Sequence, residues 1–140
     1  MQTNAIHTPT EDLGKLLIRS ALAILVLLHG ISKLTGGIDG IAGMLANAGL
    51  PAVFAYGVYV GEVIAPLLVL IGLWTRAAAA VMAVNMVVAI MLVHLPELAQ
   101  LNKQGGWALE LQGMFLFGAI AVALLGAGRY SVGGINGKWN

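Results

Sequence analysis

The sequence predicts an all-α integral membrane protein built as a four-helix bundle. Of its 140 residues, 59% are hydrophobic and 9% are charged, whereas a soluble domain carries roughly a quarter of charged residues. Helices are expected because backbone groups in lipid must pair within their own segment, which an open sheet cannot achieve at its edges. Each of four apolar segments has about the 20 residues that a helix needs to cross a bilayer: 13–34, 53–74, 77–96 and 107–126.

A helix-start signal precedes the first segment. Thr10 can cap the helix with its hydroxyl, and Glu11 and Asp12 add acids to the first turn, where the helix dipole favours them. Residues 1–12 are predicted to form a flexible N-terminal tail. Since no internal repeat divides the chain, residues 1–140 are predicted to be one domain.

The connection after the first segment, TGGIDGIAGMLANAGLPAVFAYG, is too long for a tight turn and too apolar for a free loop. It predicts a short helix that lies along the membrane interface or re-enters the membrane. Gly49, Leu50 and Pro51 would end this helix and start the second segment. A tight turn over 72–76 would join the second and third segments.

Basic residues are distributed unequally between the two sides of the four segments. Five of them fall on the side of the termini and two on the other, so the positive-inside rule predicts that both termini are cytoplasmic. The five are Lys15, Arg19, Arg76, Arg129 and Lys138, and the two are Lys33 and Lys103. All three arginines lie at the predicted cytoplasmic border, where we expect them to snorkel to lipid headgroups. A formal net charge of +1 gives no reason to expect nucleic acid as a partner.

Ionisable residues of four segments fall in the same half of the membrane. A charge in hydrocarbon costs about 2.5–3.5 kcal/mol even on permissive scales, so these side chains are expected to face one another as a polar chamber. The chamber would consist of His29, Lys33, Glu62, His94 and Glu110. Lys33 would be the counter-ion of Glu62, His29 would lie furthest inside the chamber, and His94 would lie at its mouth.

Three interpretations of this chamber are open. In the first it is a ligand site for a quinone headgroup or a small oxidisable molecule: His29 or His94 donates to a carbonyl, and Glu62 or Glu110 moves protons. In the second it is a structural network that fixes the helices. In the third His29 and His94 hold haem or a metal ion, although no short-range ligand spacing supports a metal site.

Small and polar residues elsewhere have packing roles. Gly57, Gly61 and Ala65 form a small-residue stripe on the second segment, which favours close helix contact. Asn85, near the middle of the third segment, is expected to make a hydrogen bond between helices.

Several stretches, in order along the chain, resemble the DoxX family of small bacterial inner-membrane proteins. They are LIRSALAILVLLHGISKL, NAGLPAVFAYGVYVGEVIAPLLVLIGLWTRAAA, VHLPE and GAGRYSV. The resemblance implies a four-helix protein of the bacterial inner membrane. It also implies a link to thiosulfate:quinone oxidoreductase and to membrane complexes for thiol and oxidant defence.

With no cysteine and no nucleotide-binding motif, the chain lacks redox groups of its own. We therefore expect a subunit that binds quinone or an electron-rich or sulfur compound and acts with a soluble oxidoreductase. His29, Glu62 and Glu110 are the candidate catalytic residues.

The alternative is a non-catalytic assembly or scaffold protein. A small transporter is disfavoured because no inverted repeat or pair of broken helices is evident, and homo-oligomer formation stays open.

Overall fold

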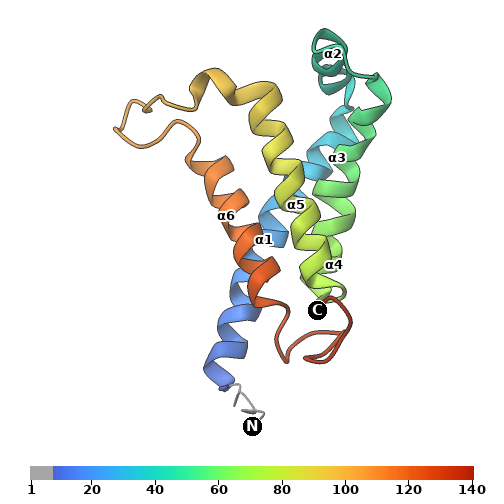
Figure 1. The fold of residues 1–140 in the computed structure, drawn as a ribbon, viewed down its shortest axis with the longest axis vertical. Helices are drawn as coiled ribbons and strands as arrows, with labels where there is room; N and C mark the ends of the chain where they lie inside the picture. Colours follow the sequence, from blue (N-terminus) through green and yellow to red (C-terminus); the bar gives the residue numbers. More distant parts are fainter. Residues whose placement is uncertain (1–7) are drawn as a thin grey trace.

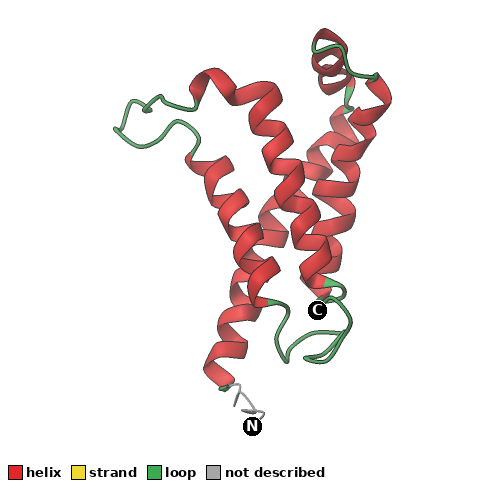
Figure 2. Ribbon diagram, in the orientation of Figure 1, coloured by secondary structure: helices red, strands yellow, loops and turns green. Residues whose placement is uncertain are grey.

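The computed structural model describes residues 8–140. Within that range the chain is helical, and its β-structure is limited to one isolated bridge between Leu101 and Trp107. The predicted all-α bundle is confirmed (Figures 1 and 2). The elements are α1 (Pro9–Gly36), α2 (Asp39–Asn47), η1 (Ala52–Tyr56), α3 (Gly57–Tyr59), η2 (Val60–Ile64), α4 (Ala65–Ile71), α5 (Thr75–Ala89), η3 (Ile90–His94), η4 (Leu95–Glu97) and α6 (Glu110–Leu125).

Three continuous helical stretches are long and apolar enough to cross a membrane: Pro9–Gly36, Ala52–Ile71 and Thr75–Glu97. The fourth, α6, has 16 residues and is therefore about 24 Å long. It is shorter than the predicted 107–126, because Leu109 has a non-helical backbone and the helix begins at Glu110. With 16 residues, α6 is shorter than the roughly 20 residues that a typical membrane span needs.

The first helix begins earlier than predicted. Thr8, not Thr10, is the N-cap: its hydroxyl accepts from the backbone N–H of Glu11, whose carboxylate accepts from the N–H of Thr8. Pro9 occupies the first turn, where a missing N–H has no cost. Residues 9–12 are thus helical and not part of a tail, and the remaining residues of the predicted tail, 1–7, lie outside the described residues.

The predicted short helix after the first span is present as α2. It lies at the end of the bundle far from the C-terminus (Figure 1). Gly49 follows it with a φ of 74°, a conformation that favours glycine, and Pro51 precedes η1. Its depth relative to the lipid stays a prediction.

Two prolines explain the wide helical turns in the second and third spans. The π-helical turns η2 and η3 end two residues before Pro66 and Pro96, respectively. Proline has no N–H to donate, and its ring collides with the carbonyl four residues earlier, so the preceding turn widens. For Pro66 that carbonyl belongs to Glu62.

Gly30 of α1 packs closely against the Glu62 carbonyl. A Cβ at Gly30 would lie 2.7 Å from the carbonyl carbon of Glu62.

The hydrophobic core lies where α1, α4, α5 and α6 converge. Its fully or nearly fully buried members include Leu22, Val69, Ala79, Met82 and Val122. Toward the α2 end the helices diverge, with α5 and α6 on one side and α1 and α3 on the other (Figure 1). His29, Lys33, Glu62 and His94 lie in this diverging part.

Arg19 caps a helix inside the protein and does not reach the headgroups. Its side chain is 2% exposed, and Nη1 donates to the carbonyls of Val69 and Leu70 at 2.7 and 2.5 Å. A further bond goes from Nη2 to the carbonyl of Tyr130. The last carbonyls of α4 have no partner within the helix, and they carry its negative dipole end. Arg19 therefore joins α1 to α4, and the snorkelling expected for it is wrong.

Arg76 does the same for α6. Its Nη1 donates to the carbonyls of Ala123 and Leu124 at 3.1 and 2.6 Å, and its Nε donates to the Asn140 carbonyl at 3.0 Å. Arg76 is exposed, so its contact with lipid headgroups stays a prediction beside this helix cap. Neither cap can be predicted from the sequence, because the partners are backbone carbonyls, which every residue carries.

Asp12 and Arg129 attach the segment 126–140 to the start of α1. Asp12 is completely buried; its Oδ1 accepts from the backbone N–H of Arg129 at 3.0 Å, and Arg129 Nε lies 3.6 Å from Oδ2. Asn140 bonds both the backbone N–H and the hydroxyl of Thr75. All three arginines thus have partners within the protein.

The cap made by Arg19 predicts a large loss of stability when it is removed. Arg19→Met would leave buried carbonyls without donors, so we expect unfolding in mixed micelles to be easier by on the order of 3 kcal/mol. Lys138→Met, at an exposed position, is the control and should change little. Equal stability of the two variants would contradict the role assigned to Arg19.

Candidate functional site

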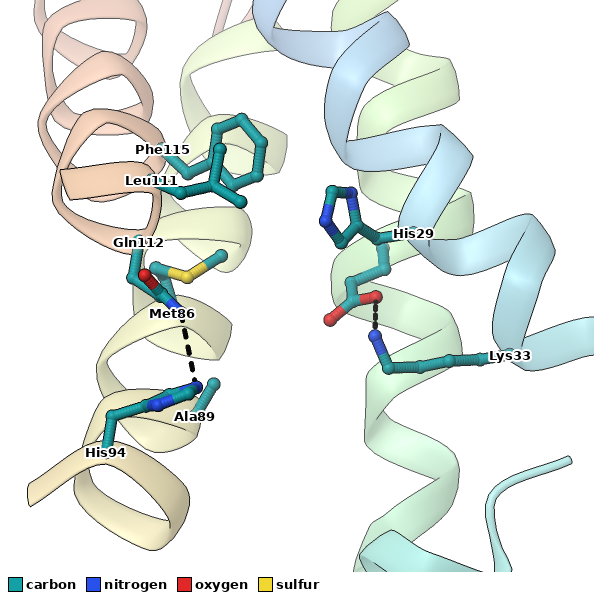
Figure 3. A pocket seen from close by; sticks show the side chains of 9 residues that line it. His29, Lys33, Met86, Ala89, His94, Leu111, Gln112 and Phe115 are labelled. Carbon is teal, nitrogen blue, oxygen red and sulfur yellow. Dashed lines mark hydrogen bonds and ion pairs between the residues drawn. The ribbon is translucent and has the colours of Figure 1, made fainter. Parts of the chain in front are cut away.

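A pocket of about 130 Å³ lies between the two diverging halves of the bundle. A cavity of about 150 Å³ in another protein holds one benzene ring, so this pocket suits one small ring or a compact polar molecule. Figure 3 shows its two sides, with His29 and Lys33 facing the side chains from α5, η3 and α6. The lining residues are His29, Lys33, Glu62, Met86, Ala89, His94, Leu111, Gln112 and Phe115.

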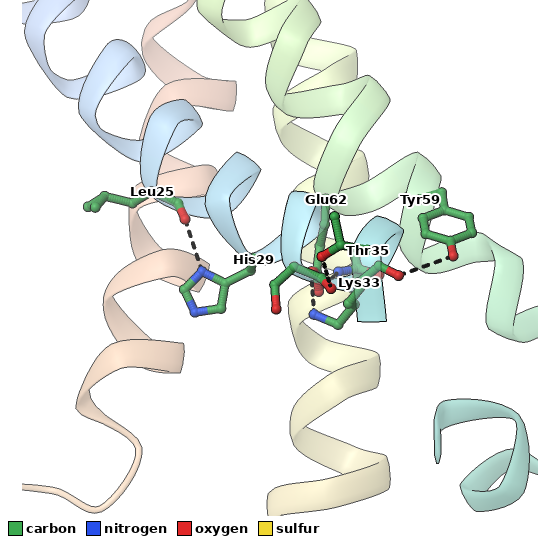
Figure 4. Close-up of polar contacts among 8 residues, drawn as sticks. Leu25, His29, Lys33, Thr35, Tyr59 and Glu62 are labelled. Atoms are coloured by element: carbon green, nitrogen blue, oxygen red, sulfur yellow. Dashed lines mark hydrogen bonds and ion pairs between the residues drawn. The ribbon is translucent and has the colours of Figure 1, made fainter. Parts of the chain in front are cut away.

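An ion pair lies on one side of the pocket. Lys33 Nζ is 2.5 Å from Glu62 Oε2, and the two side chains are 28% and 7% exposed. Asn85 of α5 donates to the other carboxylate oxygen, Oε1, at 3.4 Å. The pairing of Lys33 with Glu62 (Figure 4) and the interhelical bond of Asn85, both expected from the sequence, are confirmed.

The local backbone positions Glu62 for this pairing. The wide turn η2 carries it, and Gly30 lets α1 approach this turn, which puts Lys33, one turn further along α1, opposite the carboxylate. Gly61 packs on the Asn85 side chain, because a Cβ at Gly61 would lie 2.5 Å from that of Asn85. Gly57, by contrast, has no atom within 4 Å of such a Cβ. The predicted small-residue stripe therefore provides a close contact at Gly61 but not at Gly57.

The His29 side chain is exposed, but it contacts α6 at Phe115. Phe115 lies nearly one turn further into the bundle than Gln112, the contact of His94. The Nδ1 atom of His29 is 2.9 Å from the carbonyl oxygen of Leu25, one turn earlier in α1 (Figure 4). The imidazole also meets Phe115 of α6 edge to face, with ring centroids 5.4 Å apart and planes at 84°. These two contacts fix the position and the plane of the ring.

His94 is held from both ring nitrogens. Its Nδ1 is 3.0 Å from Glu97 Oε2, and its Nε2 is 3.2 Å from Gln112 Nε2. Its side chain is 25% exposed, so His94 is better covered than His29. Since a carboxylate only accepts, Nδ1 donates to Glu97 and the neutral ring accepts from Gln112 at Nε2.

Glu110 is not part of the pocket, and the prediction that it faces the other four residues is wrong. It is exposed at the first position of α6, and its carboxylate lies against Gly106 of the preceding loop. The sequence placed it at the right end of the bundle, but its first-turn position turns it toward the loop. Glu110 is accordingly removed from the candidate catalytic residues.

The arrangement does not fit haem or a metal ion between the two histidines. Both ring nitrogens of His94 are engaged, and the pocket is of the size of a single small ring. Among residues 8–140, no three His, Cys, Asp or Glu side chains gather in a way that could hold a metal ion.

Five lining residues were not predicted: Met86, Ala89, Leu111, Gln112 and Phe115. Leu111 and Phe115 are four residues apart on α6 and share a face, but apolar spacing of this kind also describes ordinary core. Gln112 is the exception, since a polar side chain within an apolar segment is a signal that sequence analysis can use.

Comparison with known proteins gives a family match and one curated relative. Residues 14–95 match the family model described as DoxX. The chain is 31% identical over 105 residues to "Putative oxidoreductase CatD" of Bacillus subtilis, which covers 75% of this chain and 78% of that protein. No solved structure gives a significant match.

The ion pair predicts non-additive stability changes. Glu62→Gln leaves the Lys33 ammonium without its counter-ion, and we expect a loss on the order of 3 kcal/mol in mixed-micelle unfolding. Adding Lys33→Met should recover part of this loss. Glu97→Gln is the control, because that carboxylate is 47% exposed and exposed pairs contribute about 1 kcal/mol or less. Strictly additive losses at 33 and 62 would show that the two side chains do not interact.

Proposed function

Since the chain belongs to the DoxX family, we propose that it is a membrane subunit of a redox system. In this proposal the pocket binds a quinone headgroup or a small oxidisable sulfur or electron-rich molecule. The catalytic or binding residues are His29, Lys33, Glu62 and His94. The name of the Bacillus subtilis relative, which describes an oxidoreductase, supports the reaction class.

One observation carries the proposal. The pocket joins an apolar side, formed by Met86, Leu111 and Phe115, to a side with the ion pair and the His29 imidazole. Ligand sites in proteins combine these features: apolar walls that bury a ligand and a few polar groups that orient it. An aromatic ring with polar substituents satisfies both sides.

The electrons have to come from or go to a bound cofactor or another protein. The chain has no cysteine and so no thiol or thiolate-ligated cluster to carry them. A soluble oxidoreductase that docks on the membrane subunit is therefore part of the proposal.

The proposed location is the bacterial inner (cytoplasmic) membrane, as a multi-pass protein with both termini in the cytoplasm. The excess of Lys and Arg on the side of the termini supports this orientation. The pocket, at the other end of the bundle, then opens toward the outer face of the membrane.

A structural role is the second candidate, and a specific observation favours it. Lys33, Glu62 and Asn85 form a connected network across three helical stretches, and such a network can specify one arrangement of helices without a ligand. A scaffold or assembly protein needs nothing more.

Filling the pocket distinguishes the two candidates. Ala89→Phe places a ring inside the pocket, whereas Val88→Phe places the same ring at a neighbouring position that is 46% exposed. If the pocket is a ligand site, Ala89→Phe should abolish binding of duroquinone and its reduced form, durohydroquinone, in a detergent titration. Val88→Phe should bind as the wild type does.

Thermal melting of both variants provides the folding control. Equal binding by Ala89→Phe and the wild type, or no binding by a folded wild type, would leave the scaffold role as the better account.

A further inference from the structure

The tautomer of His29 determines what its free nitrogen can do. The Leu25 carbonyl only accepts hydrogen bonds, so the 2.9 Å contact requires that Nδ1 carries the proton. In a neutral imidazole the other nitrogen, Nε2, is then an acceptor. The ring reaches into the space between the two sides of the pocket, toward Leu111 and Phe115 (Figure 3).

His94 does not offer an equivalent group, because Glu97 and Gln112 occupy both of its ring nitrogens. Among the lining residues, His29 Nε2 is therefore the imidazole nitrogen available to a ligand.

The ion pair between Lys33 and Glu62 supplies the other polar groups that a ligand in the pocket can contact. The Glu62 carboxylate is acceptor-only and already receives Lys33 and Asn85. The Lys33 ammonium has three protons, and one contact to Glu62 leaves donors for a ligand. A ligand that contacts both His29 and Lys33 must donate to the first and accept from the second.

A hydroxyl group can donate to His29 Nε2 and accept from the Lys33 ammonium. A quinone carbonyl only accepts, so its lone pairs would face the lone pair of Nε2. The pocket has the size of one ring and an apolar side to hold it. Resting on the proposed function, we infer that this pocket selects the reduced, hydroxyl-bearing form of its ring ligand, a hydroquinone, over the corresponding quinone.

The test is a comparison of three ligands that share one tetramethyl-substituted ring, of which the dimethyl ether is bulkier by its two methoxy methyl groups. Durohydroquinone donates and accepts, its dimethyl ether cannot donate, and duroquinone has carbonyls in place of the hydroxyls. Anaerobic titration of the full-length protein in detergent should give an affinity for durohydroquinone at least about tenfold higher than for either of the others, since an unpaired acceptor weakens binding by about this factor.

His29→Gln should reduce the tenfold preference to about threefold or less, because an amide can present either its oxygen or its nitrogen to the ligand. Thr35→Gln, an exposed position further along the same helix, is the control and should keep the preference.

A second measurement keeps the inference testable if His29→Gln does not fold. The protein is labelled with ¹⁵N-histidine, and its NMR signals are compared with those of His7→Gln and His94→Gln. The signals that remain in both variants belong to His29, which is itself unaltered. We expect Nδ1 to carry the proton in the neutral ring and the Nε2 signal to shift on addition of durohydroquinone.

Three results would overturn the inference. Duroquinone binding as tightly as durohydroquinone, or an Nε2-protonated His29, would overturn the selectivity while leaving the pocket as a ligand site. Binding of none of the three ligands by folded wild-type protein would overturn the proposed function as well.

Discussion

The ion pair between Lys33 and Glu62 is the interaction on which the arrangement of the α2 end depends. A carboxylate in the middle of an apolar helix is tolerated only with a partner, and α1 supplies it. The pairing needs Gly30, which lets the helices touch, and the wide turn before Pro66, which carries Glu62. The pair connects α1 to the second span. The helices α5 and α6 lie across from this pair, and the pocket is the space between the pair and these two helices.

Stability and binding are assigned to different atoms of the same cluster. Glu62 receives Lys33 and Asn85, so its hydrogen-bonding capacity is largely used within the protein. His29 is different: one ring nitrogen fixes the ring to its own helix, and the other is directed into the pocket. The structural network thus prepares the site, and the two proposed roles are compatible in one protein.

The sequence was sufficient for the features that depend on periodicity, length and charge. Segment lengths predicted the spans, and the cost of a buried charge predicted that Lys33 meets Glu62. Depth along a helix gives the level of a residue but not its direction, which is why Glu110 was misplaced. The roles of Arg19 and Arg76 could not be predicted, because backbone carbonyls leave no pattern in a sequence.

The most direct test of this account is the distance between Lys33 and Glu62 in a lipid bilayer. Solid-state NMR on protein labelled with ¹⁵N at lysine Nζ and ¹³C at glutamate Cδ can measure it, with Lys33→Met identifying the signal. An ion pair has its nitrogen and oxygen within about 4 Å, so the account predicts a strong ¹⁵N–¹³C dipolar coupling that disappears in Lys33→Met. A wild-type protein without this coupling would contradict the pairing and the geometry of the pocket that depends on it.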